Sequence, residues 1–320
     1  MVAALSGDQD LHDVDLPPLP PSVLDDDDFQ LSLWMLYELH YRGFDGLDDH
    51  EWSPDAVDLR VRLEAEFESE LVRHTAAHLR YALQLGGDLT EQLAALIEAL
   101  DGPNLAGFLQ REATLEQVRE FLAQRSLYHL KESDPHAFVL PRIDGRAKVA
   151  LAELLYDEYG GGRPDRLHAR MYADAMDAAG LDSRYGTYVD LVPASTLAVN
   201  NLMSLLGLNR RLRGAALGHL AAFESTSAVP CRRIAAGIER VGLPDVVAAY
   251  FHEHVEADSV HEQVVIRDIC ESFLDDEPAQ LPDVLFGVAA CLYLDRLAAA
   301  QMLTEWRRRD QAALPHAAAS

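Results

Sequence analysis

Apolar residues recur every three to four positions through most of the chain, a spacing that predicts helices rather than strands. In residues 29–41 the apolar positions are dense enough to indicate a largely buried helix, and Gly43 follows where that helix should end. Residues 55–84 repeat the spacing over a longer stretch, until Gly86 and Gly87 interrupt it. The same pattern predicts further helices near residues 90–99, 103–111, 115–132, 144–159, 165–179, 193–207, 210–226, 229–241, 244–273 and 281–306.

Evidence for β-structure is confined to one short stretch. The run Ala137-Phe138-Val139-Leu140 is the most strand-like in the sequence, and Pro141 closes it. No G-x-G-x-x-G fingerprint, Walker loop or G-x-S-x-G elbow occurs, which argues against nucleotide-binding α/β folds and serine hydrolases. We therefore expect an all-α protein.

The chain divides by composition into four parts. Residues 1–28 are rich in proline and aspartate and carry too little apolar surface to offset the entropy of ordering, so we expect a mostly flexible arm, with Asp28 capping the next helix. Residues 29–112 form an N-terminal helical layer, and residues 113–306 form the core domain. The tail, residues 307–320, is expected to fray.

The chain is strongly acidic, with 53 aspartates and glutamates against 27 lysines and arginines and a formal net charge of -26. Such a surface repels nucleic-acid phosphates and anionic membranes, so we expect neither as a partner. The cysteines, Cys231, Cys270 and Cys291, form no C-x-x-C pair, which disfavours a zinc ribbon or a disulfide framework. No secretory signal and no uncharged stretch of roughly 18 residues is visible, so we expect a cytoplasmic protein.

The strongest chemical signal lies in residues 250–263. His254, Asp258 and His261 stand at positions i, i+4 and i+7, which places them in one row along a helix. Two neutral imidazoles and a carboxylate in a row match the ligands that iron or manganese takes. The alternative is a solvated helix face with ion pairs, which the neighbouring Glu253 would fit. Partner ligands elsewhere in the chain are needed to favour the metal site.

Glu158 and His168 flank a break in the helical pattern. Three glycines and then Pro164 separate them, and this break keeps the two side chains close in space despite a separation of ten residues. Asp165 precedes His168 by three positions, the i, i+3 arrangement that metal-binding bundles use. An acidic residue there also stabilises a helix N-terminus, so Asp165 is either a ligand or a helix cap.

One more carboxylate is expected from the preceding helix. Glu132 is the first choice, and His129, one turn earlier on the same face, is an alternate ligand or a partner of the ligand. Glu153 is another alternate. Glu38 and His40 have weaker claims, because their spacing places them on different faces of one helix.

Six of these residues, in chain order, resemble the ligand pattern of the haem-oxygenase-like diiron oxidases, also called iron-containing redox enzymes: Glu132, Glu158, His168, His254, Asp258 and His261. The resemblance covers roughly residues 110–275. It implies a haem-oxygenase-like helical bundle without haem, preceded by an N-terminal helical extension. It also implies two iron ions per chain, Fe(II) or Fe(III), with O2 as co-substrate, and leaves open whether the pair is Fe/Fe or Mn/Fe. Asp165 and His129 stay open as additional ligands.

The resemblance further implies that the protein oxidises a small molecule with O2 and electrons from a donor. The substrate would be an amine, an amino acid or a fatty acid, and the reaction N-oxygenation, desaturation or C–C cleavage. We expect Glu132, His168 and one further carboxylate to hold one ion, and the row from His254 to His261 to hold most of the other. Glu158 bridges the ions or completes the set. Four aromatic side chains near the ligands line a pocket or belong to the core: Tyr128, Tyr156, Tyr172 and Phe251.

Three competing hypotheses remain. Thiaminase-like proteins of the same fold use a cysteine nucleophile, but none of the three cysteines here has a histidine or acidic activator beside it in the sequence. A cofactorless oxidase of this fold is the second hypothesis. The third is a non-enzymatic acidic helical protein, either a metal carrier or an interaction module. The oligomeric state is also open, with a homodimer among the options.

Overall fold

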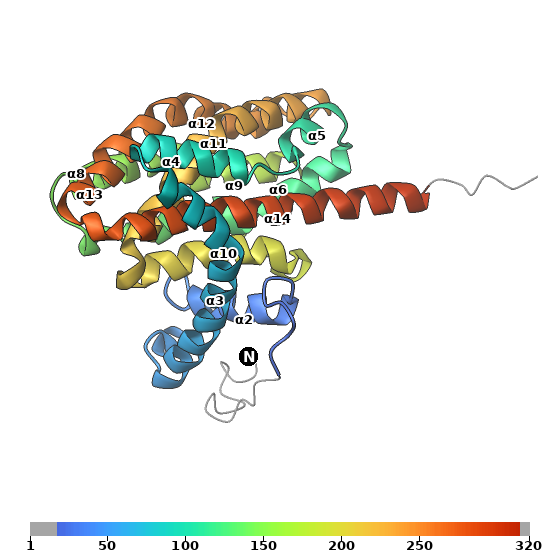
Figure 1. Cartoon of the computed structure of the whole chain (residues 1–320). Coiled ribbons are helices and arrows are strands. Elements are labelled where there is room, and N and C mark those ends of the chain that lie inside the picture. Colours follow the sequence, from blue (N-terminus) through green and yellow to red (C-terminus); the bar gives the residue numbers. More distant parts are fainter. Residues whose placement is uncertain (1–17, 314–320) are drawn as a thin grey trace, which may run out of the picture.

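The computed structural model describes residues 18–313, except the side chains of residues 256–260 and 313. In this part of the chain every regular element is helical and no strand occurs, which confirms the all-α prediction (Figure 1). None of the described helices combines the length and apolarity that crossing a membrane requires. The elements are α2 (Asp27–Glu38), α3 (Pro54–Leu85), α4 (Leu89–Ala99), α5 (Leu105–Arg111), α6 (Leu115–His129), α7 (Asp134–Ala137), α8 (Gly145–Glu158), α9 (His168–Ala178), α10 (Ala194–Leu208), α11 (Arg213–Arg240), α12 (Asp245–Gln263), the π-helix η7 (Val264–Glu271), α13 (Ser272–Asp276) and α14 (Leu281–Ala313), with short 3₁₀ turns between some of them.

The centre of the core is α11, which packs along both α12 and α14. Two glycines allow the backbones of α11 and α14 to touch. A Cβ added to Gly218 would lie 1.9 Å from the carbonyl oxygen of Val284, and one added to Gly287 would lie 1.9 Å from that of Ala215. Only glycine fits at these two positions, so the contact fixes the spacing of the two helices. Nearly every residue of α10 is buried against its neighbours, which fits the absence of charged residues from that helix.

The N-terminal helices share this core. α2 packs on α10, and α3 packs on both α2 and α14, so that Tyr37 and Phe67 are completely buried. In Figure 1 these helices, in blue, lie beside α10. The apolar residues of α2 and α3 therefore belong to one continuous hydrophobic cluster with those of α10, α11 and α14.

The segment before α2 also contacts the core where the structure describes it. The backbone N–H of Val23 donates to Glu70 Oε2 at 2.7 Å, and the Leu24 side chain is buried. The end of the segment that we expected to be a flexible arm is therefore packed against α3. Asp26, rather than the predicted Asp28, caps α2. Residues 1–17 lie outside the described part of the chain.

The largest differences from the predicted helix boundaries concern α11 and α14. The sequence predicts separate helices at 210–226 and 229–241, but α11 runs through both. Pro230 removes one backbone hydrogen bond inside this helix, and packing of the segments on both sides into hydrophobic clusters keeps it continuous. α14 extends to Ala313, past the predicted end, because Trp306 is buried and anchors the last turns.

The strand-like run at residues 137–140 forms no strand, in line with the all-α prediction. Ala137 ends α7, and Leu140 begins a 3₁₀ turn that continues to Arg142. Val139 is fully buried between them. A short apolar run fits a buried turn as well as a strand, and periodicity cannot separate the two.

Candidate metal centre

A tight glycine turn brings Glu158 and His168 together. Glu158 is the last residue of α8 and His168 is the first of α9. Gly160, Gly161 and Gly162 between them all have positive φ, a conformation that other residues adopt only with strain. As a result His168 Nδ1 lies 2.9 Å from Glu158 Oε2, and both side chains are buried. The expectation that the break holds these two side chains close is confirmed.

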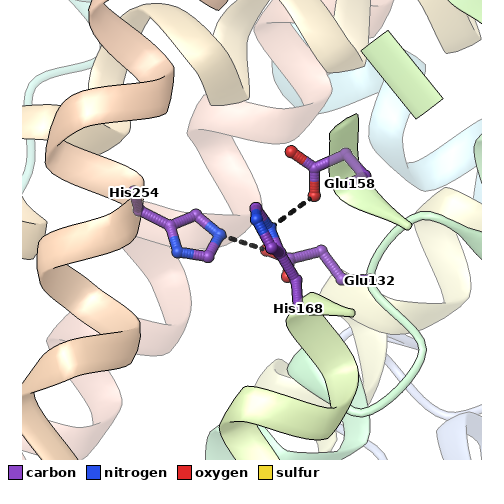
Figure 2. A group of neighbouring side chains, drawn as sticks. All are labelled: Glu132, Glu158, His168 and His254. Carbon is purple, nitrogen blue, oxygen red and sulfur yellow. Dashed lines mark ion pairs between the residues drawn. The ribbon is translucent and has the colours of Figure 1, made fainter. Parts of the chain in front are cut away.

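Glu132 and His254 complete a first group of potential ligands. Glu132 lies in the turn after α6, because that helix ends at His129 and not at the predicted residue 132. Its Oε1 is 3.4 Å from Nε2 of His254 on α12, and the ring centroids of His254 and His168 are 4.5 Å apart. Figure 2 shows the four buried side chains converging from α8, α9, α12 and this turn. One ligand atom from each lies within 4.8 Å of the others.

A second buried group adjoins the first and shares Glu158 with it. Its members are Glu158, Glu224 and His261, again with one ligand atom each within 4.8 Å. His261 Nδ1 is 3.5 Å from Glu224 Oε2 and 3.7 Å from Glu158 Oε1. Oε2 of Glu158 thus faces the first group, and Oε1 faces the second. This is the arrangement of a carboxylate placed to bridge two cations.

Glu224 was not among the ligands predicted from the sequence. A signal was present, because Glu224 is the only charged residue between Arg213 and Arg232, a stretch that is otherwise apolar or uncharged. Burial of a lone carboxylate in such a helix is costly unless a cation or hydrogen bonds compensate it. The false break predicted near Pro230 placed Glu224 at a helix end, where an exposed glutamate is unremarkable.

The two histidines of the predicted row fall into different groups. We expected His254 and His261 to share one ion, but His254 lies with Glu132 and His168, whereas His261 lies with Glu158 and Glu224. Seven residues advance an α-helix by about 10 Å, which is too far for both imidazoles to reach one ion comfortably. The side chain of Asp258, the third member of the row, lies outside the described residues.

The other candidates lie outside both groups. Asp165 is exposed in a 3₁₀ turn, and Glu153 is exposed on α8. His129 is 3.5 Å from Glu132 Oε1, and it contacts the Tyr250 hydroxyl at 2.6 Å. The two weaker candidates are bound elsewhere: Glu38 pairs with Lys131 and Tyr185, and His40 contacts Arg60 and Glu51.

Electrostatics favour a charged carboxylate at Glu132. Burial alone would raise the pKa of Glu132, but the imidazoles of His254 and His129 hold it well below its ordinary value. At His168 burial lowers the pKa, and the Glu158 carboxylate more than offsets this, so the pKa is raised overall. The neighbouring imidazoles thus stabilise the ionised form of Glu132.

This donor set fits divalent iron. Across the two groups, three carboxylates and three imidazoles meet below the surface. The ion-pair partners of Glu132 and Glu158 in the described part of the chain are histidines rather than lysines or arginines. Imidazoles bind metal in their neutral form, so in a loaded site the three buried carboxylates would carry excess negative charge, which a pair of divalent cations would neutralise. Mixed imidazole and carboxylate ligands suit iron and manganese.

A small cavity of about 20 Å³ adjoins the first group. Its polar wall is formed by the ligand candidates with Ser133 and His136, and its apolar wall includes Leu220 and Phe223. Such a volume holds little more than one water-sized molecule. Of the aromatic residues expected near the ligands, Tyr128 lines the cavity, Tyr172 and Phe251 are buried in the core, and Tyr156 is exposed.

Comparisons with known proteins point to iron-containing enzymes. A family model described as "Iron-containing redox enzyme" matches residues 119–296, which include every ligand candidate in both groups. A nitrosourea synthase from Streptomyces achromogenes subsp. streptozoticus is 26% identical over 233 residues, or 68% of this chain and 48% of that protein. The chain therefore spans about half the length of this curated relative.

A solved structure supports the fold. A CADD-like protein of unknown function from Nostoc punctiforme PCC 73102 superposes with a TM-score of 0.55 at 17% sequence identity. The match covers 68% of this chain and 96% of that chain. At this identity the likeness concerns the fold alone.

Proposed function

Because the chain belongs to the iron-containing redox enzyme family and has its haem-oxygenase-like helical fold, we propose that it is an O2-dependent non-haem diiron oxidase acting on a small molecule. The observation that carries the proposal is the pair of buried ligand groups that share Glu158. Carboxylate-bridged pairs of metal ions in helical bundles use this kind of donor set.

Each group would hold one iron ion. Glu132, His168 and His254 would bind the first, and Glu224 and His261 would bind the second. Glu158 would join the two through its separate oxygens. We retain Asp258 as a proposed ligand of the second ion, on its position in the sequence alone.

The bound irons would supply the redox chemistry with O2, and an external donor would supply electrons. The protein supplies positions and exclusion of water. Leu220 and Phe223 make one wall of the cavity apolar, which would favour a small apolar molecule such as O2 over bulk water beside the ligand groups. The cavity is too small for a substrate, so we expect the substrate to enter by displacing side chains around it.

Among the reactions open to the family, we propose N-oxygenation of an amine or a related nitrogen compound. The name of the relative, nitrosourea synthase, describes formation of an N-nitroso compound. A route to such a product must add oxygen to nitrogen, which desaturation and C–C cleavage do not do. Substrates with a free nitrogen are therefore the first to test.

The proposal is tested by loading the protein with Fe(II) under nitrogen, counting iron per chain, and measuring O2 uptake with a reductant and a panel of amines, amino acids and fatty acids. We expect His254→Ala and His261→Ala each to lower iron occupancy. His252→Ala is the matched control, since His252 lies on the same helix but is exposed and pairs with Glu239. Iron binding without O2 uptake on any substrate would favour a metal carrier, and unchanged iron in both variants would refute the ligand assignment.

A further inference from the structure

Tyr250 touches two of the proposed ligands of the first iron. It lies on α12 one turn before His254, and it is 1% exposed. Its hydroxyl is 2.9 Å from Glu132 Oε2, and its backbone carbonyl is 2.9 Å from His254 Nδ1. A single buried residue therefore contacts ligands that come from two different elements.

The contact with the carbonyl settles which nitrogen of His254 can bind metal. A carbonyl oxygen only accepts, so His254 Nδ1 must carry the proton that it donates. In the neutral imidazole this leaves a lone pair on Nε2, the atom 3.4 Å from Glu132 Oε1. Hydrogen bonds of this kind commonly fix the orientation of histidine ligands.

The contact with the Tyr250 hydroxyl fixes the direction of the hydrogen bonds that link His129, Tyr250 and Glu132. An ionised Glu132 only accepts, so the Tyr250 hydroxyl donates its single proton to Oε2. His129 Nδ1, 2.6 Å from the same hydroxyl oxygen, must then be the donor. The chain runs from His129 through Tyr250 to Glu132, and every group in it is buried or nearly so.

We propose that Tyr250 and His129 are positioning residues that restrict Glu132 to one metal bond, through Oε1. The inference rests on the proposed function, because it concerns a ligand of the first iron. Tyr250 occupies Oε2, whereas Oε1 faces His254 Nε2 within the ligand group. A carboxylate that binds through one oxygen fills one coordination position instead of two. The hydrogen bonds from His129 and Tyr250 would therefore leave one position on the first ion open.

Tyr172 provides a matched comparison within the same aromatic cluster. Its ring centroid is 4.8 Å from that of Tyr250 and 4.6 Å from that of His129, and it too is fully buried. Its hydroxyl, however, donates to the backbone carbonyl of Leu122 and not to a ligand. Tyr172→Phe therefore removes a buried hydroxyl and leaves the chain to Glu132 intact.

The test compares Fe(II)-loaded wild type, Tyr250→Phe and Tyr172→Phe by near-infrared magnetic circular dichroism, which reports the coordination number of each Fe(II). Crystal structures of the loaded proteins give the distance from Glu132 Oε2 to the metal. We expect Tyr250→Phe to retain iron, to gain a bond from Oε2 and to show a changed ligand-field spectrum. Tyr172→Phe should match wild type in both readouts. An unchanged spectrum and a distant Oε2 in Tyr250→Phe would overturn the inference.

Replacements of His129 test the other end of the chain. Asparagine offers an amide N–H near the place of Nδ1, so His129→Asn should keep the wild-type spectrum, whereas His129→Leu should shift it toward that of Tyr250→Phe. Loss of iron in both would make His129 a ligand and overturn the positioning role. Wild type that binds no iron would instead refute the proposed function, and this inference with it.

Discussion

Oε2 of Glu158 lies 2.9 Å from Nδ1 of His168, although the two residues are ten positions apart in the sequence. Glu158 is the last residue of α8 and His168 is the first residue of α9. The glycine turn joins the two helices and so sets the distance between these side chains. Glu158 also faces His261 through its second oxygen. The position of this one carboxylate thus determines whether the two ligand groups can act together.

Replacing the shared carboxylate should affect both ions, whereas replacing Glu224 should affect one. We expect Glu158→Ala to lose most of its iron, because each group loses a ligand. Glu224→Ala should retain roughly half of its iron, because the first group stays complete. The second group loses one ligand, which should weaken its affinity for iron about 10–100-fold, by analogy with disrupted metal shells. Metal analysis of the Fe(II)-loaded, desalted proteins measures the difference, and equal iron in the two variants would contradict a shared role for Glu158.

The glycine turn itself can be tested with two neighbouring substitutions. A Cβ at Gly160 would lie 2.4 Å from the carbonyl oxygen of Arg163, whereas one at Gly161 would come no closer than 3.9 Å to Tyr156. Both glycines have positive φ, which costs an alanine about 1 kcal/mol at either position. We therefore expect Gly160→Ala to destabilise the protein more than Gly161→Ala and to lower iron occupancy, because α9 must shift.

Urea unfolding of both glycine variants, with iron counted in parallel, provides the measurement. Gly161→Ala is the control for backbone strain alone. If the two variants were equally stable and equally loaded with iron, the close approach at Gly160 would not be what holds His168 in place.

The ion pair between Lys131 and Glu38 ties the N-terminal layer to the turn that carries Glu132. Both side chains are buried, and the Lys131 ammonium also lies 4.3 Å from the ring centroid of Tyr41. Removing one partner leaves the other charge buried without compensation, which typically costs about 3–5 kcal/mol. We expect that loss in Lys131→Met, with reduced iron occupancy, because Glu132 is the next residue.

Two comparisons isolate the buried pair. The double variant Lys131→Met with Glu38→Leu should recover much of the lost free energy of unfolding, because no unpaired charge remains. Arg146→Met breaks an ion pair with Asp268 at the surface and should cost at most about 1 kcal/mol. A double variant as unstable as the single one would mean that packing, and not charge, explains the effect.

Much of this architecture follows from local sequence rules. The row containing His254 and His261 follows from helical spacing, and the proximity of Glu158 and His168 follows from the glycines between them. Glu224 could not be found in this way, because only tertiary packing of α11 against α12 brings it to His261. The division of the ligands into two groups is likewise a consequence of helix packing, which spacing along one helix does not encode.

Two buried histidines near the site make the stability of the iron-free protein depend on pH. Burial lowers the pKa of His136 to about 4, and burial, with the nearby His136, holds the pKa of His219 well below its ordinary value. In the unfolded chain both would titrate near pH 6.5. Between about pH 6.5 and pH 4 the unfolded state therefore binds more protons, so the free energy of unfolding falls as the pH falls through this range.

His219→Phe removes one of these contributions while it keeps a ring stacked on Phe223. The slope of unfolding free energy against pH should then become shallower by up to about 1.4 kcal/mol per pH unit below pH 6. Urea unfolding of the iron-free proteins at several pH values between 7 and 4.5 measures that slope. His252→Gln, at an exposed position, should leave it nearly unchanged. A wild-type slope in His219→Phe would contradict this expectation. It would mean that His219 accepts a proton in the folded protein as readily as in the unfolded chain.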